Sequence, residues 1–155
     1  MQLTQPSVIP IGVPDGRQRA VIDAVLPSVD NGRFAAKCVA GEPFHVEAHC
    51  FAEGHDVLRV MLQWQREGEA RTAEVPMKLK WNDEWHADFT PPVPGRYRYT
   101  VTAWVDAFES WHHELERRVD PEDIRIAARV GAAEILAAAG RAGQTHAQDA
   151  KLLRE

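Results

Sequence analysis

The chain has 155 residues, of which 45% are hydrophobic and 26% charged, a composition typical of one globular domain, alone or with a fragment of another. The formal net charge of -5 gives no electrostatic support for nucleic-acid binding, and no run of Lys or Arg suits an anionic membrane surface. No segment approaches the roughly 20 apolar residues of a membrane span, and the N-terminus lacks the basic start and apolar stretch of a secretory signal. We therefore expect a cytoplasmic protein with no nucleic-acid or membrane partner.

The two cysteines, Cys38 and Cys50, are too few for a disulfide framework, and their spacing matches no zinc motif. We interpret them as buried or half-buried thiols in a reducing compartment.

Residues 1–18 are rich in Pro, Gly and polar groups, which predicts a flexible N-terminal tail. From residue 19 to residue 119 the pattern is mainly one of apolar and polar residues in alternation. In the segment PFHVEAHCF, Phe44, Val46, Ala48 and Cys50 share one face, and the histidines and Glu47 share the other, as in a half-buried strand. Similar segments are RAVIDAVLP, DVLRVMLQW, TAEVPMKL, NDEWHADF and RYRYTVTAWVD.

Several such strands with short turns predict a mainly β protein, an antiparallel sandwich over residues 19–119. We expect an immunoglobulin-like arrangement, although the Cys-Trp-Cys pattern of antibody domains is missing.

The alternation stops at Asp120, where the sequence DPED predicts the start of a helix. Asp120 can cap it, Pro121 fits the first turn, and two acidic residues complement the helix dipole. The segment IRIAARVGAAEILAAAG continues the helix, and Gly140 and Gly143 mark its end. We interpret residues 120–155 as the start of a truncated helical segment, because one Ala-rich helix and part of another need further chain, the sandwich or a second copy to cover their apolar face.

The stretch SWHHELE is the first candidate for chemistry. His112 and His113 are neighbours, so on a strand or a helix their side chains diverge and do not easily hold one ion. The H-E-x-x-H spacing of a zinc helix is absent, and so are a G-x-S-x-G elbow and a phosphate-binding glycine loop. Acidic pairs such as Asp106 with Glu109 occur at turns, where exposed carboxylates are common. We therefore predict no catalytic, cofactor or metal residue. We expect the two histidines to be polar residues on the surface at the edge of the sandwich, or part of a partner interface.

The tryptophans divide into two groups. Trp64 and Trp85 share the parity of apolar neighbours, which favours a place in the core. Trp104 falls on the polar side of its strand, Trp111 follows close to Phe108, and Trp81 is expected in a loop. Exposed aromatic residues suit a sugar platform, a docking surface or a site covered by helices. We favour docking or helix cover, so Trp104, Trp111, Phe108 and Trp81 are possible interface or glucan contacts.

Long strings of this sequence resemble one enzyme family. The strings are RAVIDAVLPSVDNGRFAAKCVAGEPFHVEAHCFAEGHDVL, EVPMKL, NDEWHADFTP and PGRYRYTVTAWVDAFESWHHELERR. Together they are similar to the N-terminal region of bacterial alpha-glucan:maltose-1-phosphate maltosyltransferases, members of the alpha-amylase superfamily. The resemblance runs from about Arg19 to the end of the chain.

This resemblance implies a glycosyltransferase that moves maltosyl units from maltose 1-phosphate to an alpha-1,4-glucan, with a homodimer formed through the sandwich and the helices. It places the catalytic residues in a (β/α)₈ barrel of the same chain, which needs about 200 residues or more. Fewer than 40 residues follow the sandwich, so no catalytic residue carries over and we expect these 155 residues alone to be inactive. The alternatives are a free-standing carbohydrate-binding sandwich and a protein-interaction module that dimerises through Trp104 and the helices.

Overall fold

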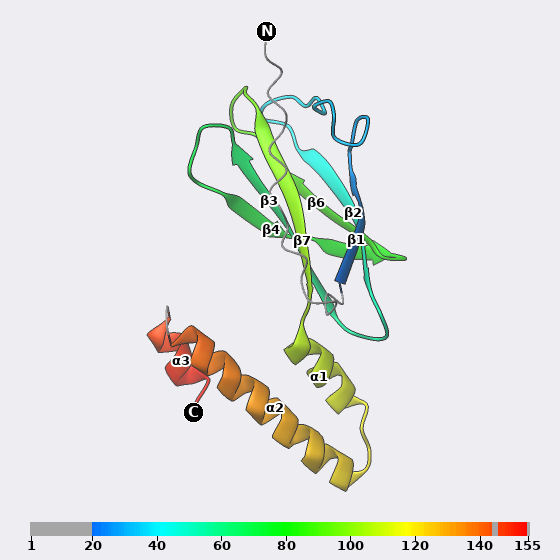
Figure 1. Cartoon of the computed structure of the whole chain (residues 1–155), viewed down its shortest axis with the longest axis vertical. Coiled ribbons are helices and arrows are strands. Elements are labelled where there is room, and N and C mark those ends of the chain that lie inside the picture. Colours follow the sequence, from blue (N-terminus) through cyan, green and yellow to red (C-terminus); the bar gives the residue numbers. More distant parts are fainter. Residues whose placement is uncertain (1–19, 144–145, 155) are drawn as a thin grey trace.

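The computed structural model describes residues 20–143 and 146–154, and the expected tail over residues 1–18 lies outside them. A β-sandwich forms one end of the molecule and three helices project from the other end (Figure 1). Seven strands build the sandwich: β1 (Ala20–Leu26), β2 (Phe44–Ala52), β3 (Leu58–Arg66), β4 (Ala73–Pro76), β5 (Lys78–Trp81), β6 (Glu84–Phe89) and β7 (Tyr97–Val105).

The strands form two antiparallel sheets, with the orders β1-β2-β6-β5 and β4-β3-β7. The first order matches the A-B-E-D sheet of immunoglobulin domains, and β3 and β7 correspond to strands C and F. Where an immunoglobulin chain would form strand G, this chain enters a helix. Tyr97, at the start of β7, donates a hydrogen bond from its hydroxyl to the carbonyl of Val93 (3.0 Å), as in the tyrosine corner of such domains. The predicted immunoglobulin-like sandwich is confirmed.

The core lies between the two sheets and follows the predicted parity. Each of the central strands β2, β3, β6 and β7 turns alternate apolar side chains inward, as a period of two requires. The buried core residues are Phe44, Val46, Ala48, Cys50, Val60, Leu62, Met77, Ala87, Phe89 and Val101. Trp64 stacks on Phe89 with ring centroids 5.1 Å apart, and the indole N–H of Trp85 donates to the carbonyl of Cys50. Both tryptophans pack against the core, as predicted.

The segment TAEVPMKL, predicted as one strand, forms parts of two. β4 pairs with β3 in one sheet, whereas β5 pairs with β6 in the other. Pro76 ends β4 because it has no N–H to donate to the ladder. Met77 then inserts its side chain into the core, only 4% exposed, while its amide donates to the carbonyl of Val60 (2.8 Å). The chain therefore crosses between sheets at a buried residue, which alternation alone did not reveal.

Three helices follow the sandwich: α1 (Ala107–Glu116), α2 (Pro121–Ala142) and α3 (Ala147–Leu152). Helix α1 corrects the expectation that the strand pattern continues to residue 119, and it contains the stretch SWHHELE. Asp106 caps it by accepting a hydrogen bond from the amide of Glu109 (3.0 Å). Phe108, Trp111 and Leu115 recur at helical spacing in this segment. The expectation of strand alternation over the same residues obscured this helical pattern.

The predicted start of α2 is confirmed. Asp120 Oδ1 accepts hydrogen bonds from the amides of Glu122 (2.9 Å) and Asp123 (3.1 Å). The buried residues of α2 are Ala127, Gly131 and Ala139, a narrow stripe of small side chains. Among the described residues, no helix is both long enough and apolar enough to cross a membrane.

Candidate functional site

The outer face of the four-stranded sheet carries a block of histidines and carboxylates at its two central strands. The pattern of each strand alternates acid and histidine on this face, and the register sets an acid of one strand opposite a histidine of the other. The three facing pairs are His45 with Asp88, Glu47 with His86, and His49 with Glu84. We call these six residues the acid–histidine block. Directly opposed side chains on an antiparallel pair are close enough to interact.

One end of the block is a hydrogen-bonded relay. His45 Nδ1 lies 2.8 Å from Asp88 Oδ1, and His45 Nε2 lies 2.9 Å from His86 Nδ1. The remaining ring nitrogen, His86 Nε2, is buried and has no hydrogen-bond partner among the residues that the structure describes. Glu84 Oε2 lies 3.6 Å from His86 Nε2.

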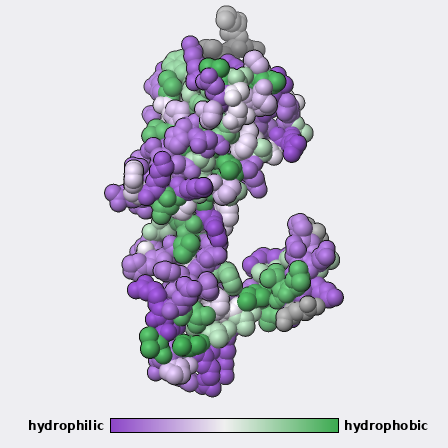
Figure 2. All heavy atoms as spheres, turned by 180° about the vertical axis from the view of Figure 1, so that it is seen from behind, coloured by the Kyte–Doolittle hydropathy of each residue, from purple (hydrophilic) through white to green (hydrophobic). Residues whose placement is uncertain are grey.

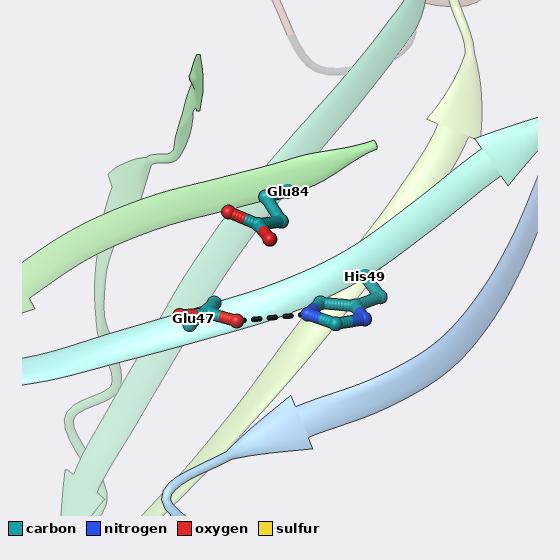
Figure 3. Close-up of side chains that lie close together, drawn as sticks. All are labelled: Glu47, His49 and Glu84. Carbon is teal, nitrogen blue, oxygen red and sulfur yellow. Dashed lines mark hydrogen bonds and ion pairs between the residues drawn. The ribbon is translucent and has the colours of Figure 1, made fainter. Parts of the chain in front are cut away.

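The other end of the block brings together Glu47, His49 and Glu84, with one ligand-type atom from each within 4.8 Å of the others. Glu47 and His49 point toward each other along β2, with the carboxylate of Glu84 beside them from β6 (Figure 3). The hydrogen bond from His49 Nε2 to Glu47 Oε1 (2.8 Å) lowers the pKa of Glu47 and raises the pKa of His49. Both side chains remain partly open to solvent.

The prediction of no metal residue rested on the diverging side chains of His112 and His113 and on histidine spacings that match no zinc motif. The polar face of the strand carrying His45 and His49 was noted, but not the same alternation at Glu84, His86 and Asp88. That second alternation, in a strand expected to pair in a sandwich, was the available signal. Imidazole nitrogens and carboxylate oxygens together are a donor set that divalent metal ions use in proteins.

The stretch SWHHELE lies in helix α1. His112 and His113 are exposed on α1, where His112 lies 3.8 Å from Glu116 and stacks near Phe108. Ser110 Oγ accepts a hydrogen bond from the amide of Val57 (2.8 Å) and donates one to the carbonyl of Asp106 (2.7 Å). Both capacities of the hydroxyl are thus used in fixing α1 to the sandwich.

The acidic pair Asp106 and Glu109 serves the same junction. Arg59 Nε lies 2.9 Å from Asp106 Oδ2, and its Nη2 lies 3.1 Å from Glu109 Oε1. Burial alone would raise the pKa of Asp106, but the hydrogen bonds from the Glu109 amide and from Arg59 outweigh it and lower that pKa.

The four candidate aromatic contacts do not form one surface. Trp81 ends strand β5 instead of lying in a loop, and it is 66% exposed. Trp104 lies on the outer face of β7, in the other sheet, and is 45% exposed. Phe108 and Trp111 do meet, with ring centroids 5.4 Å apart. Trp111 itself packs on α2, where its Nε1 donates to the carbonyl of Ala127 (2.7 Å). The role of the four as interface or glucan contacts stays a prediction.

A hollow of about 780 Å³ lies at the end of the sandwich where β7 begins, and α1 follows the other end of that strand. Its walls carry five cationic side chains together with the rings of Tyr97 and Tyr99. The cations are Arg33, Lys37, Arg66, Arg96 and Arg98. Glu67 is the one acidic residue of the lining. This hollow could not be read from the sequence, because its lining comes from five separate stretches of the chain.

Together these features define a two-sheet sandwich domain with a helical extension. Comparison with known proteins makes the assignment specific: residues 18–155 match the family model of alpha-1,4-glucan:maltose-1-phosphate maltosyltransferase, domain N/S. The chain belongs to this family, which confirms the resemblance seen in the sequence.

Two relatives illustrate the match. The chain is 43% identical to the alpha-1,4-glucan:maltose-1-phosphate maltosyltransferase of Chlorobaculum tepidum over 129 residues, which are 83% of this chain and 19% of that protein. It is 41% identical to the enzyme of the same name from Myxococcus xanthus over 140 residues, 86% of this chain and 21% of the relative. The chain thus spans about a fifth of the length of the curated relatives it matches.

Proposed function

We propose that this chain is the non-catalytic N-terminal region of a cytoplasmic maltosyltransferase that moves maltosyl units from maltose 1-phosphate to an alpha-1,4-glucan. The observation that carries the proposal is the match of residues 18–155 to domain N/S of that enzyme. The catalytic barrel, and with it the binding of donor and acceptor, belongs to the rest of the enzyme. The role of this region is to support assembly of the enzyme as a homodimer.

The helices support an assembly role because they expose apolar surface. The stripe of α2 that holds Ala127 and Gly131 is covered by α1. Ile126 and Val130, one turn apart on a neighbouring face, are 52% and 53% exposed. Hydrophobic atoms gather over the helices in Figure 2. Apolar residues that recur one turn apart on an open helix face are typical of surfaces that pack on another protein element.

The position of Trp104 supports the same role for the sheet. It lies on the outer face of β7 opposite Arg59, whose side chain reaches toward α1. An exposed tryptophan beside an arginine has the composition of an interface centre. In contrast, Trp111 packs within the helices, so the glucan-binding alternative draws on fewer exposed rings than the sequence suggested.

Sedimentation velocity on the 155-residue chain tests the assembly role. We expect a dimer that forms as concentration rises and that is weakened by the double substitution Ile126→Glu/Val130→Glu, and by Trp104→Arg. Leu136→Glu is the matched control, because Leu136 is equally exposed (59%) but lies on a different side of α2. A dimer that survives both the double substitution and Trp104→Arg, or that is weakened equally by the Leu136→Glu control, would contradict this interface.

A phosphate-release assay tests the non-catalytic role. With maltose 1-phosphate and glycogen as substrates, the chain alone should release no inorganic phosphate above the buffer rate. Release that scales with the concentration of this chain would contradict the proposal.

A further inference from the structure

We propose that the acid–histidine block on β2 and β6 binds one divalent transition-metal ion of the zinc class. Glu47, His49 and Glu84 would be ligands and His86 Nε2 the fourth. This inference is independent of the proposed maltosyltransferase role, because it rests on the local geometry of two strands.

The hydrogen bonds between Asp88, His45 and His86 restrict which ring nitrogens carry a proton. An ionised carboxylate only accepts hydrogen bonds, so Asp88 requires the proton of neutral His45 to lie on Nδ1. When both rings are neutral, His45 Nε2 is an acceptor and His86 donates from Nδ1. The proton of neutral His86 is thereby used, and its Nε2 carries a lone pair.

That lone pair lies in an unfavourable place without a cation. His86 Nε2 is buried, meets no hydrogen-bond donor within the described part of the chain, and lies 3.6 Å from an oxygen of Glu84. Two electron-rich atoms that approach each other away from water repel. A metal ion between them would turn this repulsion into two coordination bonds.

The spacing of the donor atoms also favours a metal ion. Zinc–nitrogen and zinc–oxygen bonds of about 2.0–2.2 Å in a tetrahedron set neighbouring donors roughly 3.3 Å apart. Here the pair Glu47–His49 is 2.8 Å apart, the pair Glu84–His86 is 3.6 Å apart, and the group of Glu47, His49 and Glu84 lies within 4.8 Å. The donor atoms of Glu47, His49 and Glu84 thus already form one group, and His86 Nε2 adjoins it through Glu84.

The hydrogen bonds of the relay also hold His86 in place, as hydrogen bonds behind a metal ligand usually do. A ligating histidine usually donates its other ring N–H to a carboxylate or a comparable acceptor, which fixes its tautomer and orientation. His86 does so through His45 to Asp88. Lys78 on β5 is the cation in register with His86, but it is exposed and its ammonium can stay in water.

The ion would join β2 to β6, the two central strands of the four-stranded sheet. Since a ligand that binds only the folded state stabilises it by mass action, zinc should also raise the unfolding temperature of the chain.

Titration of the chelator-treated 155-residue chain with ZnCl₂ by calorimetry, and with Co²⁺ by visible absorption, tests the proposal. We expect one ion per chain, with the visible bands of four-coordinate cobalt. The double substitution Glu47→Gln/Glu84→Gln should abolish binding, and Asp88→Asn, which removes only the outer support, should weaken it by about ten- to a hundredfold. His113→Gln, an exposed histidine outside the block, is the matched control and should bind as the unaltered chain does.

Two outcomes would overturn the proposal. One is zinc binding that the block substitutions leave unchanged, because the ion would then sit elsewhere. The other is the absence of saturable binding of Zn²⁺ and Co²⁺ by the folded, unaltered chain. Circular dichroism of each variant, which should match that of the unaltered chain, separates loss of the site from loss of the fold.

Discussion

The indole of Trp111 fills the space that a side chain at Gly131 would need. A Cβ at residue 131 would overlap the ring at Cζ2, Cε2 and Cη2, so only glycine allows α1 and α2 to approach this closely. Trp111 Nε1 completes the contact by donating to the carbonyl of Ala127. Helix cover, one of the two roles favoured for this tryptophan from the sequence, is therefore the role that Trp111 has, since it joins the two helices.

Gly131→Ala should destabilise the helical extension by about 1–3 kcal/mol, the usual cost of adding a methyl group to a filled site. Thermal unfolding followed by circular dichroism at a helical wavelength measures the effect. Gly140→Ala is the matched control: it lies in the same helix with nothing within 4 Å of its Cβ position. It should stabilise α2 by roughly 0.5–1 kcal/mol, because alanine is the better helix former. Equal effects of the two variants would contradict the packing role of Trp111.

The junction between sandwich and helices should weaken in acid. The pKa of Asp106 is lowered in the folded chain, so its contribution to stability is present above the ordinary range of an aspartate and is lost as pH falls below about 4 through the folded-state pKa. Asp106→Asn should remove that part of the pH dependence and cost roughly 0.2–1 kcal/mol at neutral pH through the lost ion pair with Arg59, because asparagine caps a helix about as well as aspartate.

Denaturant unfolding at pH 3 to 7, with the intrinsic fluorescence of the chain as the probe, checks this prediction. Asp120→Asn provides the comparison, because Asp120 caps α2 but no ion pair with an arginine is found for it among the described residues. A pH profile for Asp106→Asn that coincides with that of the unaltered chain would exclude the proposed contribution.

The two cysteines should differ sharply in reactivity. Cys50 is fully buried, and burial raises its pKa to about 11, so at pH 8 roughly one thousandth of it is thiolate. Cys38 is exposed, which corrects the expectation that both thiols are at least half-buried. A thiol-specific reagent should label one cysteine per native chain and two after unfolding.

Cys38→Ser should abolish the native labelling and leave the second, denatured-state label in place. Rapid labelling of native Cys38→Ser would show that the sandwich opens easily at β2, contrary to the packing described above.

How far the sequence predicted the structure depends on the residues concerned. The parity of Phe44, Val46 and Ala48 predicted the core, because a period of two leaves little choice of face. The cap at Asp120 predicted the start of α2. Helix α1 was missed because its helical spacing overlaps the end of a strand pattern, and the crossing at Met77 was missed because alternation continues through it.

The acid–histidine block required knowledge of strand pairing. His45 and Asp88 are 43 residues apart, and only the register of β2 with β6 makes them neighbours. The sequence gives the alternation within each strand, but the partner of each residue is decided by the packing of the whole sandwich. The contact of Trp111 with Gly131 is similar, since it depends on the angle at which α1 leaves the sandwich.

The central proposal is that this chain is one region of a larger maltosyltransferase. The mass of the native gene product, measured by immunoblot of a source-cell lysate with antibodies to this chain, tests that claim most directly. We predict a band several times heavier than the 17.4 kDa of the chain, because its relatives are about five times as long as the part that it matches. A single band at 17.4 kDa would contradict the account and would favour a free-standing sandwich.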